Sequence, residues 1–158
     1  MIAPPLLPLV LWRTPPGLEL ILRQEGASFV VADPKRPLSV RRGRFVLFDG
    51  RVVAEREVSQ RIGPDQVPIN IDFLREGATT DPLQDLVSHE AAEGRWRVGD
   101  VELRERVARV DRRALRERML ERLREVLARE NCPWVRLAPY PFPYRSAFNF
   151  RVDLDEPY

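Results

Sequence analysis

The sequence predicts a mixed α+β fold: a β-rich N-terminal domain that ends in one long amphipathic helix, followed by the opening strand of a truncated (β/α) barrel. Short runs of β-branched and aromatic residues, separated by turn residues, occupy most of the first 110 positions. Residues 112–130 instead repeat apolar side chains at helical spacing. A last apolar run, residues 147–150, leads into two aspartates close to position 158.

The length of 158 residues suits one domain, or a small domain plus a piece of another. We expect residues 1–17, which hold five of the fifteen prolines, to form an extended arm. Residues 18–131 are expected to form a β-rich accessory domain that includes the C-terminal helix. Residues 132–158 are expected to be a linker and the first strand of an incomplete second domain.

Composition and charge exclude several kinds of partner and site. The net charge is +2, and arginines alternate with glutamates, which predicts solvated ion-paired faces and no nucleic-acid partner. Cys132 is the single cysteine and His89 the single histidine, so neither an intrachain disulfide nor a structural zinc site is expected. The apolar N-terminus is too short for a bilayer and has no basic residue before Arg13, which predicts a cytoplasmic protein without a membrane partner.

The first half of the chain predicts strands joined by tight turns. Leu18–Gln24 and Ala27–Ala32 are expected to be strands that Glu25 and Gly26 connect. Arg44–Phe48 and Arg51–Ala54 flank Asp49-Gly50, a dipeptide that favours a β-hairpin.

Further along, Val67–Phe73 is expected to be a strand, and Pro68 favours a place at the edge of a sheet. A short helix is predicted from Asp81 through Ala92, closed by Gly94. A second hairpin is predicted from Arg95–Val98 and Val101–Val107 about Gly99-Asp100.

The clearest helix is Arg112–Glu130, with Asp111 as its N-cap. Asn131 suits the left-handed position after the helix, and Pro133 prevents its continuation. We expect the apolar stripe to pack on the sheet of the same domain, with a partner-binding or coiled-coil helix as the alternative. The stripe comprises Leu115, Met119, Leu123, Val126 and Leu127.

The last segment combines a proline–aromatic linker with a pair of acids. Trp134–Ala138 is expected to be a short strand. Residues 139–144 alternate proline with aromatic residues and are therefore extended. We expect them to form either a packed crossing segment or an aromatic rim near a sugar site. Asp153 and Asp155 follow the apolar run 147–150. In an extended strand their side chains would share one face, roughly 6.5–7 Å apart, an arrangement that suits a metal or general-base site.

Residues 143–156 resemble the first motif of polysaccharide deacetylases of the chitooligosaccharide-deacetylase type. Their sequence is Pro-Tyr-Arg-Ser-Ala-Phe-Asn-Phe-Arg-Val-Asp-Leu-Asp-Glu. This resemblance implies a barrel strand in which Asp153 is the general base and Asp155 a ligand of a divalent metal, zinc or similar. The family completes its metal site with two histidines of a later His-x-x-x-His motif. It removes acetyl groups from polysaccharides or oligosaccharides by metal-assisted attack of water.

The sequence departs from the family pattern at two points. Glu156-Pro157 stands where glycine often follows the second acid, and His89 lies upstream without a histidine partner four residues on. We therefore expect the metal only in a longer protein and no deacetylase activity from these 158 residues alone. The alternatives are a non-enzymatic interaction or carbohydrate-associated module, with Asp153 and Asp155 as solvated charges that pair with Arg145 or Arg151.

Overall fold

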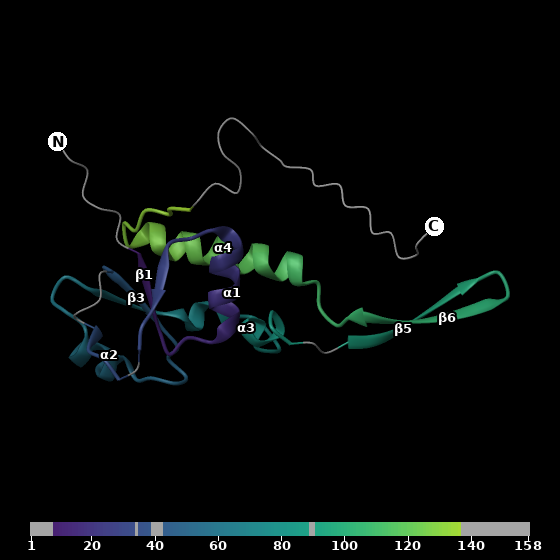
Figure 1. The fold of residues 1–158 in the computed structure, drawn as a ribbon, viewed down its shortest axis with the longest axis horizontal. Coiled ribbons are helices and arrows are strands. Elements are labelled where there is room, and N and C mark those ends of the chain that lie inside the picture. Colours follow the sequence, from purple (N-terminus) through teal and green to yellow (C-terminus); the bar gives the residue numbers. More distant parts are fainter. Residues whose placement is uncertain (1–7, 34, 39–42, 89–90, 137–158) are drawn as a thin grey trace, which may run out of the picture.

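The structure, a computed structural model, describes residues 8–33, 35–38, 43–88 and 91–136. Its helices and strands form a mixed α+β fold, as the sequence predicts. The described part has a body, in which helices pack on a four-stranded sheet, and a two-stranded hairpin that projects away from it (Figure 1). The expected barrel strand lies outside the described residues.

The sheet of the body is entirely parallel. Its strands are β1 (Leu9–Trp12), β2 (Phe29–Val31), β3 (Phe45–Phe48) and β4 (Val67–Asn70), in the order β2-β1-β3-β4. The two central strands, β1 and β3, are buried at every position. Their sequences, Leu-Val-Leu-Trp and Phe-Val-Leu-Phe, are uninterrupted apolar runs because a parallel strand with both faces covered has no solvent side.

Two apolar clusters cover the two faces of this sheet. Alternation along β1 sends Leu9 and Leu11 into the larger cluster and Val10 and Trp12 into the smaller one. Helices α1 (Pro16–Glu25) and α4 (Arg112–Arg129) bury their apolar sides in the larger cluster. Helix α2 (Glu55–Arg61) contributes Val58 to the smaller cluster on the opposite face.

The N-terminal segment differs from the expected arm and strand. Residues 9–12 are the buried central strand β1, and Leu18–Gln24 lies within helix α1 instead of a strand. Leu18, Ile21 and Leu22 are fully buried at helical spacing, and Pro16 occupies the first turn, where its missing N–H costs nothing. Gly26, with φ of 70°, caps the helix in the left-handed conformation rather than joining two strands.

The hairpin predicted about Asp49-Gly50 is also wrong. Strand β3 pairs with β1 and β4, both parallel, and residues 51–53 turn away from the sheet toward α2. The backbone N–H groups of Val52 and Val53 donate to the carbonyl of Asp49, which closes this turn. Asp49-Gly50 here follows the end of a parallel strand. The local sequence at such a position looks the same as that of a hairpin turn.

Strand β4 is confirmed at the edge of the sheet, but it ends at Asn70, and residues Ile71–Arg75 form the 3₁₀ helix η2. The N–H of Val67 donates to the carbonyl of Arg44 in the chain leading into β3. Backbone groups alternate sides along a strand, so Pro68 occupies a position that faces the open edge. Its missing N–H removes a donor that another strand could use.

The helix predicted for Asp81–Ala92 is much shorter. Helix α3 spans only Pro82–Asp85, capped by the Asp81 side chain, and Gly94 lies within a strand instead of closing a helix. The second predicted hairpin is confirmed: β5 (Ala91–Val98) and β6 (Val101–Ala108) pair antiparallel over their whole length.

Helix α4 is confirmed with both of its predicted ends. The Asp111 side chain accepts from the N–H groups of Arg113 and Ala114, and Asn131 has a positive φ of 55°. The helix packs on the body, as expected, and is not the partner-binding or coiled-coil helix of the alternative. Its buried residues are Leu115, Met119, Leu120, Leu123 and Leu127, and Val126 is partly buried against the same cluster. Of the short strand expected at 134–138, Arg136 forms an isolated bridge with Ala27.

Candidate functional site at the carboxyl edge of the sheet

The acid pair predicted from sequence, Asp153 and Asp155, lies outside the described residues, as do His89 and the aromatic segment 139–144. Their predicted roles as base and metal ligand therefore stay predictions. Across the residues that the structure does describe, no group of three or more histidine, cysteine, aspartate or glutamate side chains could hold a metal ion.

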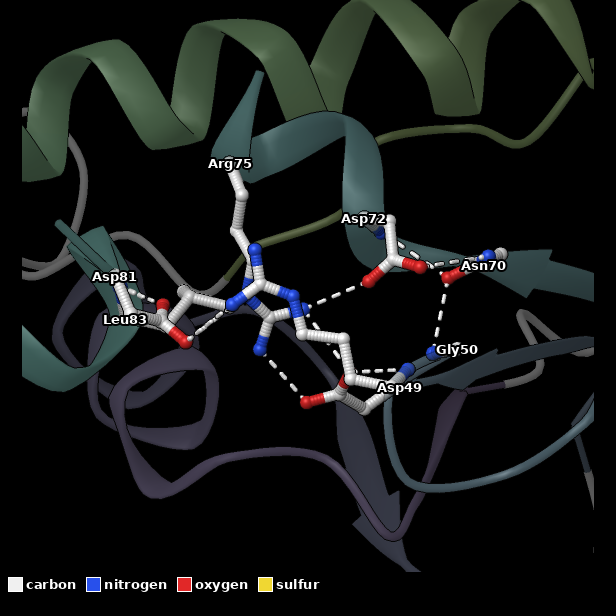
Figure 2. A network of polar contacts seen from close by, with 8 residues as sticks. Asp49, Gly50, Asn70, Asp72, Arg75, Asp81 and Leu83 are labelled. Carbon is white, nitrogen blue, oxygen red and sulfur yellow. Dashed lines mark hydrogen bonds and ion pairs between the residues drawn. The ribbon is translucent and has the colours of Figure 1, made fainter. Parts of the chain in front are cut away.

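The described residues bring a different set of charged groups together at the carboxyl ends of β3 and β4. Open parallel sheets bind ligands at this edge, so any polar cluster there is a candidate site. Asp49 directly follows β3, Asn70 ends β4, and Asp72 and Arg75 lie on η2. Asp81, the N-cap of α3, approaches from the other side (Figure 2).

The guanidinium of Arg75 is the centre of this network, which we call the Arg75 network. Its Nη2 donates to Asp49 Oδ2 over 2.7 Å and its Nη1 to Asp49 Oδ1 over 3.0 Å, a bidentate pair. Nη1 also donates to Asp72 Oδ1 over 2.9 Å, and Nε donates to Asp81 Oδ2 over 3.0 Å. The side chains of Arg75 and Asp49 are 4% and 5% exposed, so this pair is removed from water.

Every carboxylate oxygen of the Arg75 network accepts a hydrogen bond. Asp49 Oδ1 accepts from the Arg51 N–H as well as from Arg75, and Asp81 Oδ1 accepts from the Leu83 N–H. The second oxygen of Asp72 accepts from the Asn70 amide. Each oxygen thus already has a donor within the fold, although a carboxylate oxygen can accept a second hydrogen bond and the Asp72 side chain is 40% exposed.

Asn70 joins the ends of the two strands. Its Oδ1 accepts from the N–H groups of both Gly50 and Asp72, each over 3.1 Å. A Cβ on Gly50 would lie 2.4 Å from both the Asn70 amide nitrogen and an Asp72 oxygen, so a larger residue would displace these hydrogen-bonded side chains. Gly50 thus permits the close approach of the Asn70 and Asp72 side chains, a role that no hairpin turn explains.

The electrostatics keep Arg75 charged. Burial alone would lower the pKa of Arg75, but the hydrogen bonds and negative charges of Asp49 and Asp81 outweigh burial and raise that pKa above its ordinary value. Arg51 adds a weaker, exposed ion pair to Asp81 at 3.4 Å. A permanently charged cation held by three carboxylates does not exchange protons near neutral pH, so the Arg75 network is a brace between β3, η2 and α3.

Sequence reasoning missed this network. Only Asp49 came directly after a predicted strand, Arg44–Phe48, whereas Asn70 and Asp72 lay inside the strand predicted for Val67–Phe73. The position of Asp49 points to one sheet edge only if the strands are parallel, and the expected hairpin would have sent the strand ends in opposite directions. Arg75 itself carried no sequence signal that separates it from the chain's other arginines.

A second candidate is an open hollow of about 400 Å³ between α4 and residues 76–80. Arg122 forms part of its wall by donating to the carbonyls of Phe73 and Glu76. The floor is apolar, with Leu74, Leu115 and Met119 among its lining residues, and the charged residues of the rim have both signs. The hollow therefore offers neither an aligned acid pair nor a uniform field for a charged ligand.

Cys132 is the single thiol, and we expect it to react slowly. It is half-buried, and burial raises the pKa of the Cys132 thiol, an effect that nearby Arg44 only partly offsets. Because the thiolate is the nucleophile, alkylation by iodoacetamide at pH 7.5 should be at least several-fold slower in the native protein than in urea. Because the pKa of Cys132 is raised, the alkylation rate of the native protein should still be rising at a pH where an ordinary thiol is already fully ionised. Equal native and denatured rates would contradict this prediction.

No helix among the described residues is both long enough and apolar enough to span a membrane. Comparisons with protein-family models, with curated proteins and with solved structures gave no match to this chain.

Proposed function

We propose that this chain is the N-terminal portion of a metal-dependent polysaccharide deacetylase-like hydrolase that acts on acetylated sugars. In this proposal residues 9–131, which include the central strand β1, serve as an accessory domain, and Asp153 and Asp155 act as the general base and a ligand of a divalent metal such as zinc. The metal and the polysaccharide or oligosaccharide substrate are bound only in the complete protein. The proposed location is the cytoplasm, in keeping with a single cysteine.

The observation that carries the proposal is the resemblance of residues 143–156 to the first motif of these deacetylases. The Arg75 network supports the assignment indirectly. The acids at the carboxyl edge of the described sheet all accept hydrogen bonds from Arg75 or from backbone and amide donors, so they already have partners within the fold. The proposal therefore places the reactive acids in the motif and gives the body a supporting role.

The test starts from a coding sequence extended until a downstream His-x-x-x-His motif is included. The extended protein should release acetate from an acetylated chitooligosaccharide when Zn²⁺ or Co²⁺ is added. Asp155→Ala should lower turnover by about 100-fold or more, because a metal supplies several kcal/mol of charge stabilisation. Asp65→Ala, a change at an exposed aspartate of the body, is the matched control and should leave turnover unchanged.

The 158-residue chain gives a second, opposite arm of the same test. It should be inactive in the same assay, because the family mechanism needs two histidines and this chain has one. If the 158-residue chain does release acetate, and Asp155→Ala abolishes this activity, then the site does not need the later histidines, and this part of the proposal is wrong. An extended protein with the histidines but no metal-dependent acetate release would overturn the function itself.

The second candidate function is a non-enzymatic interaction module. The observation that favours it is the group of exposed apolar side chains on the β5–β6 hairpin, namely Trp96, Val98, Val101 and Leu103. A stop codon directly after position 158 would favour this candidate over the deacetylase.

A further inference from the structure

The open hollow beside α4 is built from three elements. The first half of α4 and the segment 76–80 form its walls, and α3 contributes Pro82 and Asp85. Its volume of about 400 Å³ falls within the range of roughly 300–1,000 Å³ that is typical of small-molecule sites. The hollow is therefore large enough to hold part of a small ligand.

The walls and the floor of this hollow are held in place by the fold. Arg122 donates to the carbonyls of Phe73 and Glu76 over 3.2 Å and 2.9 Å, which ties the segment after η2 to α4. Leu74 and Met119 belong to the larger apolar cluster, so the floor is part of the packed core. The hollow is thus a preformed feature of the body, as ligand sites usually are.

The rim offers hydrogen-bonding groups of both kinds that the fold leaves unused. Thr79 and Arg118 are exposed, and neither side chain has a hydrogen bond or ion pair to another described residue. Asp85 accepts from the Thr80 hydroxyl over 2.6 Å through Oδ2, which leaves its Oδ1 as an acceptor. A guanidinium only donates, a carboxylate oxygen only accepts, and a hydroxyl does both. A ligand with several hydroxyl groups would find partners of each kind here.

The charges around the hollow favour a neutral ligand. Its charged lining residues are Glu76, Asp85, Asp111, Arg118 and Arg122. Asp111 caps α4 and Arg122 is bound to two carbonyls, so both of these charges already have partners. An anionic group placed at Arg118 would enter a hollow whose acids outnumber its arginines, and such like-charge placement costs affinity. A ligand without a formal charge avoids this cost.

A sugar ring has the chemistry that matches this hollow. The faces of a pyranose ring present C–H groups, and the hydroxyls around the ring each donate and accept hydrogen bonds. The apolar floor can take a C–H face while the rim groups pair with the hydroxyls. Polar groups of the ligand then keep hydrogen-bond partners when they leave water, which is the condition for burying them without a large cost.

We propose that the hollow binds one sugar residue of a neutral oligosaccharide. The ring would lie on Leu115 and Met119, and its hydroxyls would pair with Thr79, Asp85 and Arg118. The choice of an acetylated sugar chain rests on the proposed function, whereas the neutral, hydroxylated character of the ligand rests on the hollow itself. The proposed function places the reacting acetyl group at a metal in the complete protein, but the hollow uses residues of the 158-residue chain. Because the hollow is open, binding should be weak, with a dissociation constant on the order of 0.1–10 mM.

An NMR titration of the ¹⁵N-labelled 158-residue chain with N-acetylated chitotetraose, up to about 20 mM, covers the expected dissociation constant. Amide signals of residues 76–80 and 110–119 should shift as the sugar is added. Ala114→Phe places a ring in the hollow and should raise the dissociation constant at least tenfold. Ala128→Phe makes the same change at an exposed position of the same helix outside the hollow, and it should leave the dissociation constant unchanged.

Thr79→Val provides a second variant that leaves the core untouched. It removes one hydroxyl from an exposed segment and should raise the dissociation constant about 2–10-fold, the loss expected for one hydrogen bond. Urea unfolding of each variant should give the wild-type midpoint, which separates lost binding from lost folding.

Several results would overturn the proposal. One is the absence of shifts at 76–80 and 110–119, and another is a dissociation constant that both Ala114→Phe and Thr79→Val leave unchanged. Tighter binding of octanoate than of the tetraose would also overturn it, because the hollow would then take an apolar anion. None of these results depends on acetate release. An extended protein that is active, but whose body does not bind the tetraose, contradicts this inference alone. Binding by the short chain beside an inactive extended protein contradicts the proposed function alone.

Discussion

Arg75→Met is expected to lower the free energy of unfolding by about 3–5 kcal/mol, because it leaves the buried carboxylate of Asp49 without its cation. Asp49 is 4% exposed, and the bidentate pair with Arg75 supplies hydrogen bonds to both of its oxygens. Methionine fills much of the same volume, so the loss reports the unpaired charge rather than a cavity. Urea unfolding followed by circular dichroism would measure the change.

Two further variants isolate this cause. Arg51→Met removes a cation that reaches only Asp81, at 3.4 Å and on the surface, so it should cost less than about 1 kcal/mol. The double variant Asp49→Asn with Arg75→Met removes the orphan charge and should recover part of the single-variant loss. An Arg75→Met cost as small as that of Arg51→Met would show that the Arg75 network is not a buried brace.

Leu123→Ala is expected to cost about 2–5 kcal/mol, the range for deleting a buried leucine side chain. Leu123 is fully buried at the centre of α4 and belongs to the larger apolar cluster on the sheet. Glu125→Ala on the exposed side of the same helix is the matched control and should change the free energy by less than about 0.5 kcal/mol. Its ion pair to Arg129 spans 4.0 Å at the surface. A Leu123→Ala cost below about 0.5 kcal/mol would mean that α4 does not pack on the sheet.

The elements that sequence predicted correctly are those that local signals determine. Helix α4 has an N-cap at Asp111, a continuous apolar stripe and a left-handed Asn131, and each signal is complete within a few residues. The β5–β6 hairpin likewise needs only alternation and a Gly-Asp turn between its strands. Both elements have the predicted type, with ends that differ by no more than a few residues.

The elements that sequence predicted wrongly depend on distant parts of the chain. Leu18–Gln24 is compatible with a strand or a helix until the proline pair before it and the sheet beneath it are both considered. Asp49-Gly50 signals a hairpin unless β1 and β4 already occupy both sides of β3. The same limit hid the Arg75 network, because Arg75 and Asp49 are 26 residues apart and meet only when the strands are parallel.

The position of β1 has a consequence for how the chain folds during synthesis. Leu9–Trp12 emerges first, yet both of its neighbours, Phe29–Val31 and Phe45–Phe48, are made later, and helix α4 covers the sheet only after residue 129. This fully apolar strand therefore has no partner on the ribosome until later strands are made, whereas the β5–β6 hairpin can close as soon as it is made. During this interval β1 is an unpaired apolar segment of the kind that chaperones bind.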